Sequence, residues 1–176
     1  MKVVGLGGRS RPRLFAAAVV LVPCLVVTGA GCTSFRPASL PCHAGVGGQR
    51  YGLDAEQAVN ASTIAAVART LGLPDHAVTV ALAAALQESK LHNVDYGDTD
   101  SVGLFQQRPS SGWGTVKDLM TPAYAAKQFY EALVSIQGWQ SMALTYAIQA
   151  VQVSAYPDAY APHEWAAQTV VDALTG

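Results

Sequence analysis

The chain has 176 residues, of which 51% are hydrophobic, 8% aromatic and 13% charged, and its formal net charge is −1. Four of the eleven basic residues lie within residues 1–31, which contain no acid, so residues 32–176 are acidic and lack the basic stripe of a nucleic-acid-binding protein. One apolar segment near the start contributes much of the high mean hydropathy, which excludes a transporter or channel with repeated membrane spans.

The N-terminal part of the chain has the pattern of an export signal or membrane anchor. A basic, glycine-rich start precedes residues 14–31, which carry no charge. Cleavage as a signal peptide, retention as a single-span anchor and lipidation at Cys32 are all open. Small residues precede Cys32 as in a bacterial lipoprotein box, but Gly29 replaces its large aliphatic residue, so we favour anchoring by residues 14–31. Each alternative, secretion and lipoprotein formation included, places residues 33–176 outside the cytoplasm.

Two cysteines follow this segment at a spacing that suits a small disulfide loop. Cys32 and Cys42 lie in a stretch rich in Pro, Gly and Ser, and an extracytoplasmic location permits them to pair unless Cys32 is acylated. The four histidines and three cysteines show no metal-ligand spacing. We therefore expect no metal and no cofactor.

Residues 32–52 have the composition of an extracytoplasmic linker, and residues 53–176 have that of one folded domain. Asp54 with Gln57 three residues later predicts a capping box, which opens a helix over residues 55–71. Gly72 is expected to end that helix.

The next helix is predicted to be buried on all sides. It starts near Asp75, and from Ala77 to Leu86 only Thr79 is polar. We expect this helix to be central in the domain and to end between Glu88 and Leu91.

Further helices are predicted over residues 122–135, 141–153 and 162–174. The best candidate for a short extended segment is residues 103–107, close to the polar loop that follows the buried helix. Residues 150–160 are expected to form a packing corner between helices. The expected fold class is mainly α, with about five helices in a single domain.

Glu88 is the residue that most suggests chemistry. It lies at the C-terminal end of the predicted buried helix, where the helix dipole disfavours a negative charge and apolar neighbours withhold solvation. Both effects raise the pKa of a carboxyl, as a general acid working near neutral pH requires. The alternative is that Glu88 lies in solvent or caps a loop amide.

Two short motifs carry a family resemblance. Residues 85–89 (ALQES), followed by residues 103–107 (GLFQQ), resemble the E-S and G-L-M-Q signature of soluble lytic transglycosylases in the lysozyme-like superfamily. Phe105 replaces the usual Met. The resemblance covers residues 53–174, and the wider string is similar to exported or membrane-anchored actinobacterial proteins with this domain. It implies a mainly α, lysozyme-like fold.

The resemblance implies cleavage of the β-1,4 bond between N-acetylmuramic acid and N-acetylglucosamine in peptidoglycan glycan strands. Glu88 would protonate the leaving oxygen and then take the proton of the muramic 6-hydroxyl, giving a 1,6-anhydro product without a carboxylate nucleophile. The family's Ala-Tyr-Asn motif is absent, and its nearest counterpart is residues 144–149, which contain Tyr146.

Several polar and aromatic residues near these motifs are candidates for binding a sugar. Because Gln106 and Gln107 would alternate faces in an extended segment, only one could face the substrate, and the resemblance favours Gln106. Trp113 suits a sugar platform and a core position equally well. The candidate substrate-binding residues are Ser89, Asp95, Tyr96, Gln106, Gln107, Trp113 and Tyr146.

The acidic loop after Glu88 supports a second chemistry. Asp95 or Asp98 facing Glu88 across a cleft would permit muramidase-type hydrolysis with two carboxylates. The same acids, with Asp100, could instead hold Ca²⁺ or simply cap turns in a solvated loop. A non-catalytic cell-wall-binding protein that keeps the fold is a further alternative. We expect a monomer that contacts the membrane through its N-terminal segment and does not bind nucleic acid.

Overall fold

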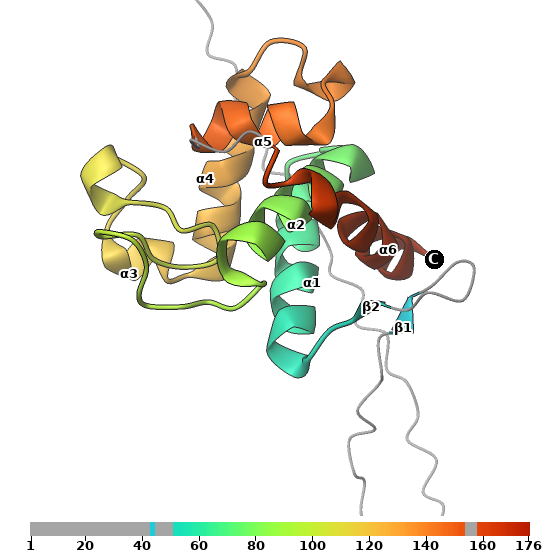
Figure 1. Cartoon of the computed structure of the whole chain (residues 1–176), viewed down its shortest axis with the longest axis horizontal. Helices are drawn as coiled ribbons and strands as arrows, with labels where there is room; N and C mark the ends of the chain where they lie inside the picture. The colour runs from blue at the N-terminus through green and yellow to red at the C-terminus, as the bar shows by residue number, and fades with distance from the viewer. Residues whose placement is uncertain (1–42, 45–50, 154–157) are drawn as a thin grey trace, which may run out of the picture. The chain divides into compact units, whose positions relative to one another are not determined.

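Helices dominate the residues that the computed structural model describes, which are 43–44, 51–153 and 158–176 (Figure 1). All of these lie in one unit of the chain, residues 39–176. The prediction of a mainly α fold is confirmed. In chain order the elements are β1 (His43–Ala44), β2 (Tyr51–Gly52), α1 (Ala55–Thr70), α2 (Asp75–Ser89), η1 (Pro109–Ser111), α3 (Val116–Leu119), α4 (Pro122–Ser135), η2 (Trp139–Ser141), α5 (Leu144–Gln152), η3 (Ala161–His163) and α6 (Glu164–Thr175).

The start and end of α1 follow from local sequence. The Asp54 carboxylate accepts a hydrogen bond from the Gln57 backbone amide, and the Gln57 side chain accepts one from the Asp54 amide, both at 2.9 Å. This is the predicted capping box. After the helix, Gly72 adopts φ +68°, a left-handed conformation that glycine takes at little cost.

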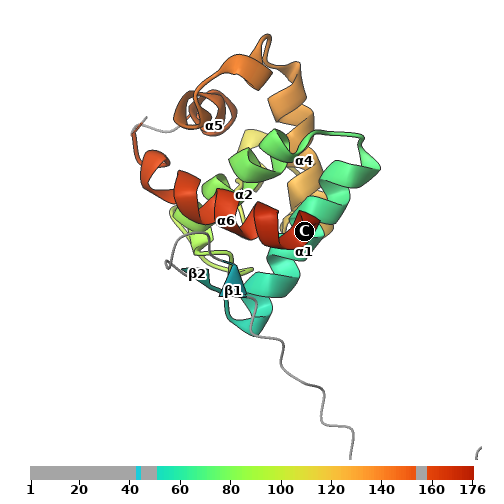
Figure 2. The same cartoon turned by 90° about the vertical axis from the view of Figure 1, so that its right-hand side faces the viewer.

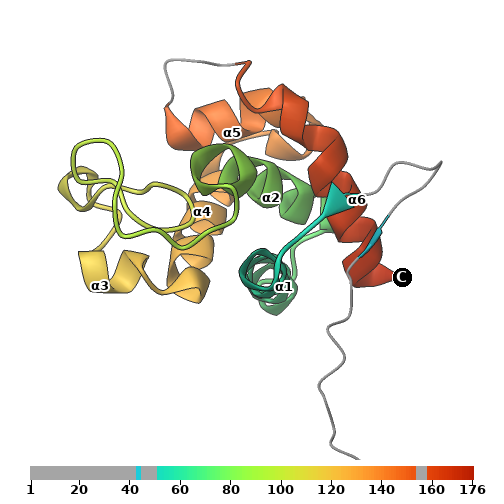
Figure 3. The ribbon, with the colours of Figure 1, turned by 60° about the horizontal axis from the view of Figure 1, so that its bottom comes forward.

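Helix α2 is the centre of the domain, as its composition predicts. Every residue from Ala77 to Leu86 is buried. Helices α1, α4, α5 and α6 all pack against α2, and Figure 3 shows α2 enclosed by them. In Figure 2, α6 passes in front of α2. The polar Thr79 is satisfied inside this core, since its hydroxyl lies 3.1 Å from the Gln168 amide oxygen.

The later helices differ in part from expectation. The helix predicted over residues 122–135 is confirmed as α4. The helix predicted from residue 141 instead begins at Leu144, because residues 139–141 form the 3₁₀ turn η2 and the chain is extended at Met142. The last helix begins at Glu164, after the 3₁₀ turn η3. The short helix α3 was not predicted.

The predicted extended segment at residues 103–107 is wrong. Residues 103–106 form turns, and only Val102 and Gln107 pair, as an isolated antiparallel bridge. Left-handed conformations at Gly103 (φ +77°) and Gln106 (φ +47°) fold the chain back on itself there. The turn buries Phe105, whose ring stacks on Phe129 with centroids 4.8 Å apart. Aromatic packing therefore outweighs the weak strand preference of this segment.

The N-terminal predictions lie outside the described residues. These are the membrane anchor at residues 14–31, the linker before Tyr51 apart from β1, and the fates of Cys32 and Cys42. Within the part of the chain that the structure describes, no helix is both long and apolar enough to cross a bilayer.

Candidate functional site

Glu88 lies in the last turn of α2, where the buried helix reaches the surface of the domain. Its side chain is half-buried. The Tyr160 hydroxyl donates a hydrogen bond of 2.8 Å to Glu88 Oε1, and the Gln152 side chain is a second hydrogen-bond partner. Tyr160 precedes η3 and Gln152 ends α5, so three distant parts of the chain meet at this carboxyl.

The pKa of Glu88 is raised above the ordinary value for a glutamic acid. Burial is the largest cause, because it withholds solvation from the charged form. The hydrogen bonds from Tyr160 and Gln152 act in the opposite direction, since they favour the carboxylate. Burial makes the Glu88 carboxyl keep its proton to a higher pH than an exposed glutamic acid does, and the two hydrogen bonds stabilise the charged form once the proton is lost. A group that acts first as a general acid and then as a general base needs both properties.

An open pocket of about 370 Å³ lies beside Glu88. This volume is within the range of small-molecule sites in proteins. Its walls come from the end of α2, the loop between Asp98 and Arg108, the end of α5, and the residue before η3. The lining residues are Glu88, Asp98, Ser101, Phe105, Gln106, Arg108, Gln152 and Tyr160.

Of the seven predicted substrate-binding residues, Gln106 lines this pocket. Its side-chain amide donates to the backbone oxygens of Tyr96 and Gly103, each at 3.2 Å. Gln107 does not line the pocket: it is 2% exposed and donates to the Ala125 oxygen at 3.3 Å. Because residues 103–106 form a turn, Gln107 re-enters the core beside α4.

Ser89 joins α2 to that turn and does not line the pocket. Its hydroxyl donates to the Leu104 backbone oxygen at 2.8 Å and lies 3.1 Å from the Ala85 oxygen. The two motifs on which the resemblance rests are therefore in direct contact. Ser89 positions the turn that carries Phe105 and Gln106.

Four other predicted binding residues are placed elsewhere. Asp95 and Tyr96 are exposed on the loop after α2, with Tyr96 72% exposed, and neither lines the pocket. Tyr146 lies on α5 with 60% of its surface exposed, also outside the pocket. Trp113 is half-buried and packs against the hydrophobic core, so its position is that of a core residue.

Two acidic residues of the loop after α2, Asp98 and Asp100, have different surroundings. Asp98 lines the pocket with Glu88. Asp100 instead accepts hydrogen bonds from Arg108 at 2.8 Å and from the Ser110 amide at 2.9 Å. Led by the Arg108 bond, these interactions lower the pKa of Asp100 to about 2. Among the described residues, there is no group of three or more His, Cys, Asp or Glu side chains that could hold a metal ion.

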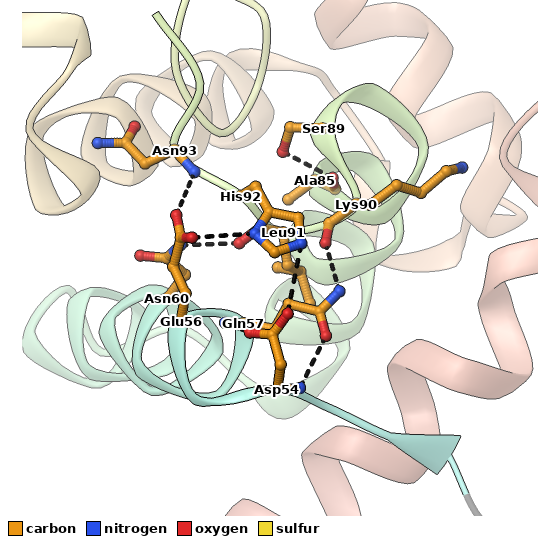
Figure 4. Close-up of polar contacts among 10 residues, drawn as sticks. All are labelled: Asp54, Glu56, Gln57, Asn60, Ala85, Ser89, Lys90, Leu91, His92 and Asn93. Atoms are coloured by element: carbon orange, nitrogen blue, oxygen red, sulfur yellow. Dashed lines mark hydrogen bonds and ion pairs between the residues drawn. The ribbon is translucent and has the colours of Figure 1, made fainter.

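The backbone just after Glu88 is held in an unusual conformation. Lys90 and Leu91 both adopt left-handed φ values, +56° and +64°. Side chains from the start of α1 bind the carbonyls of these two residues: Gln57 donates to the Lys90 oxygen at 2.8 Å, and Asn60 donates to the Leu91 oxygen at 2.7 Å (Figure 4). These bonds compensate a conformation that costs about 1–3 kcal/mol per residue.

A second set of contacts fixes the next two residues, His92 and Asn93, against the start of α1. Glu56 accepts a hydrogen bond from the Asn93 amide at 2.9 Å, and its other oxygen lies 3.0 Å from His92 Nδ1. His92 Nε2 is 3.5 Å from Asp54. Figure 4 shows these side chains converging from α1 on the segment that leaves α2. The first turns of α1 thus position the helix end that carries Glu88.

Four of the pocket residues are not indicated by the sequence: Ser101, Arg108, Gln152 and Tyr160. Tyr160 and Gln152 belong to the segment predicted to form a packing corner, yet both contact Glu88. Arg108 follows the second motif but carries no predicted binding role. The only sequence signals were a polar residue, Gln152, at the apolar end of the α5 segment and a tyrosine, Tyr160, two positions before a proline. Neither indicates a partner that lies 64 or 72 residues away.

Comparison with known proteins does not identify a family for this chain. A scan against models of protein families finds none that matches the chain, and no curated protein matches it.

Proposed function

We propose that this protein cleaves the glycan strands of peptidoglycan at the β-1,4 bond between N-acetylmuramic acid and N-acetylglucosamine, as a lytic transglycosylase of lysozyme-like fold. The observation that carries the proposal is Glu88: a half-buried carboxyl with a raised pKa, hydrogen-bonded to Tyr160, on the wall of an open polar pocket. The two motifs that resemble the family are in contact through Ser89 and Leu104, and Glu88 of the first motif lines the pocket with Phe105 and Gln106 of the second.

The chemistry needs one acid that becomes a base. Glu88 gives its proton to the glycosidic oxygen as the bond from that oxygen to the muramic C1 breaks. The resulting cationic centre is stabilised by the 2-acetamido group of the substrate. The Glu88 carboxylate then accepts the proton of the muramic 6-hydroxyl as its oxygen bonds to C1, which closes the 1,6-anhydro ring and restores the acid.

Tyr160 and Gln152 serve both halves of this cycle. Their hydrogen bonds stabilise the carboxylate that exists between the two proton transfers, while burial favours the protonated form that starts the cycle. A carboxyl with these partners changes charge twice without leaving its position. This matches the positioning that general acid–base catalysis requires.

Hydrolysis is the second candidate, and Asp98 favours it. Its carboxyl lines the same pocket as Glu88, as a two-carboxylate mechanism requires. The products separate the two reactions, because transglycosylation leaves anhydro-muramic ends and hydrolysis leaves reducing ends.

The location follows from the same proposal. We propose that residues 14–31 anchor the chain in the membrane and that the helical domain lies outside the cytoplasm, where peptidoglycan is. Secretion after cleavage, or lipidation at Cys32, would bring the domain to the same substrate.

The decisive experiment compares the full chain with its Glu88→Gln variant on isolated peptidoglycan. The amide keeps the shape of the side chain but cannot give up a proton, so we expect a loss of roughly 10²- to 10⁴-fold in the rate of glycan cleavage. Glu131→Gln is the matched control, because Glu131 lies exposed on α4 in an ion pair with Lys127. Mass detection of anhydro-muramic ends measures the reaction.

Two results would overturn the proposal. Equal cleavage by the wild-type protein and the Glu88→Gln variant would remove Glu88 from the chemistry. Absence of cleavage by both, together with retention of the protein on peptidoglycan, would favour a non-catalytic wall-binding protein.

A further inference from the structure

The charges on the pocket wall are unevenly distributed. Arg108 is the only cationic side chain among the described residues that line the pocket. Asp98 is exposed on the same wall, and burial favours the uncharged form of Glu88. An anionic group of a ligand would therefore gain attraction at Arg108 and meet repulsion at Asp98.

Asp100 holds one side of the Arg108 guanidinium and is itself fixed by hydrogen bonds from Ser110. The Arg108 Nε donates to Asp100 Oδ1 at 2.8 Å. Asp100 also accepts from the Ser110 hydroxyl at 3.0 Å and, through Oδ2, from the Ser110 amide at 2.9 Å. Because these bonds lower the pKa of Asp100 to about 2, its carboxyl is ionised near neutral pH. The guanidinium is thus oriented before any ligand arrives.

The terminal nitrogens of Arg108 have no hydrogen-bond partner among the residues that the structure describes. Its side chain is 41% exposed and lines the pocket. A guanidinium carries five N–H donors in a planar fork, and only the Nε donor is used by Asp100. Four donors remain, in the arrangement that binds a carboxylate through two parallel hydrogen bonds.

We propose that Arg108 binds a carboxylate on the muramic sugar of the substrate and thereby sets the register of the glycan strand in the pocket. This inference rests on the proposed function. Peptidoglycan strands alternate a sugar that carries an acidic substituent with a neutral one, so a single cation selects every second sugar. The carboxylate is either the free lactyl group of a peptide-free strand or the first carboxylate of an attached peptide.

The experiment compares Arg108→Gln with the wild-type full chain on three substrates of matched length. They are peptide-free glycan strands, peptide-bearing strands and neutral chitin oligosaccharides. We expect the KM of Arg108→Gln to rise about tenfold more on the carboxylate-bearing strands than on chitin oligosaccharides. Loss confined to peptide-free strands identifies the lactyl carboxylate, and loss confined to peptide-bearing strands identifies the peptide carboxylate.

Two further variants separate recognition from folding. Arg108→Lys keeps the charge but loses the planar fork, so we expect it to recover part of the affinity. Lys127→Gln removes an exposed cation on α4 and is expected to affect the three substrates equally. Equal effects of Arg108→Gln on all three substrates would overturn the inference, because they indicate a structural role through Asp100.

A binding assay tests the role of Arg108 without requiring that the protein cleaves its substrate. In the Glu88→Gln background, peptide-free strands are titrated against proteins with and without Arg108→Gln. We expect Arg108→Gln to weaken binding about tenfold. If the wild-type chain cleaves none of the substrates but this difference persists, the proposed reaction fails and the carboxylate site remains. If cleavage occurs and the difference is absent, the carboxylate site fails and the reaction remains.

Discussion

At the scale of single residues, two opposing influences meet at Glu88. Burial raises the pKa of its carboxyl, and the bonds from Tyr160 and Gln152 lower it by a smaller amount. The Tyr160 hydroxyl lies 2.8 Å from Glu88 Oε1, and Tyr160 itself is buried, with 1% of its surface exposed. Removing one of the opposing influences should therefore move the pKa in a direction that is known beforehand.

We predict that Tyr160→Phe raises the pKa of Glu88 further, because it removes a donor that favours the carboxylate. A reaction that starts from protonated Glu88 declines as pH rises through this pKa, so the alkaline limb of its pH profile should move to higher pH. A carbon NMR titration of the Glu88 carboxyl measures the pKa directly. Tyr96→Phe, at an exposed tyrosine, is the control, and an unchanged or lower pKa in Tyr160→Phe would refute the prediction.

Gly97 lies directly against the side chain of Gln106, which lines the pocket. A methyl group on Gly97 would overlap Gln106 Oε1 and lie 2.7 Å from the Ser101 backbone oxygen. Gly97 is not among the residues with positive φ, so the obstacle is space and not backbone conformation. The absence of a side chain at Gly97 lets Gln106 bind the Tyr96 oxygen and brace the loop that carries Asp98.

We predict that Gly97→Ala displaces Gln106, destabilises the protein by about 1–3 kcal/mol and lowers activity. Hydrogen exchange of the amides of residues 96–106 should become faster. Gly52→Ala is the matched control, since nothing lies within 4 Å of its added carbon. The effect of Gly97→Ala should be smaller in a Gln106→Ala background, where much of the overlap is gone. An equal effect in both backgrounds would show that the two residues do not compete for this space.

At the scale of elements, the start of α1 supports the end of α2. The contacts run from Asp54, Glu56, Gln57 and Asn60 to four consecutive residues after Ser89 (Figure 4). Glu56 is central to this set, and its pKa is lowered, first by the Asn93 amide and then by the His92 side chain. The support of the helix end that carries Glu88 is therefore sensitive to pH through a carboxyl remote from the pocket.

We predict that the contribution of the Glu56 charge to stability is lost in acid. A folded-state pKa below the unfolded value of 4.5 means that this contribution is complete above that pH and falls as pH drops through the folded-state pKa. Glu56→Gln keeps an acceptor for the Asn93 amide but removes the charge, so it should lower the free energy of unfolding near neutral pH.

Denaturant titrations near neutral pH and at about pH 3 measure this effect as the difference between wild type and Glu56→Gln. The difference should shrink in acid. The low pKa of Asp100 also contributes to acid sensitivity, but it is present in both proteins and cancels. A difference that is constant with pH would assign the role of Glu56 to packing alone.

At the scale of the whole described domain, the core is organised around α2. Its small side chains, Ala77, Ala81, Ala83, Ala84 and Ala85, are buried and allow α1, α4, α5 and α6 to approach the helix from several sides. The larger Leu82 fills the space between them and is 0% exposed. The position of Glu88 thus depends on a helix that the rest of the domain encloses.

We predict that Leu82→Ala lowers the free energy of unfolding by about 2–5 kcal/mol, because it leaves a cavity in a core that cannot fully collapse around it. Val59→Ala on α1 is the control, since Val59 is 64% exposed and should change stability by less than about 0.5 kcal/mol. Denaturant unfolding of both variants measures the difference. Similar losses for the two variants would contradict the central position of α2.

The local sequence was sufficient to predict those features of the fold whose stability depends on interactions between residues close together in the chain. The Asp54 capping box, the left-handed Gly72 and the burial of Ala77 to Leu86 are all confirmed. Each depends on contacts within a few residues or on a composition that only a core position tolerates. The turn at residues 103–106 was predicted wrongly, because the stacking of Phe105 on Phe129 outweighs local preference.

A mainly α domain and a carboxylic acid at the end of its buried helix both follow from the residue pattern alone. The packing of distant segments is what brings Tyr160, Gln152, Asp98 and Arg108 to the pocket of that acid. Asp95, Tyr96 and Tyr146 lie outside this pocket. The physical reason is distance along the chain. Caps and helix faces follow from interactions between residues a few positions apart, whereas the partners of Glu88 depend on how α5 and the Tyr160 segment pack beside α2.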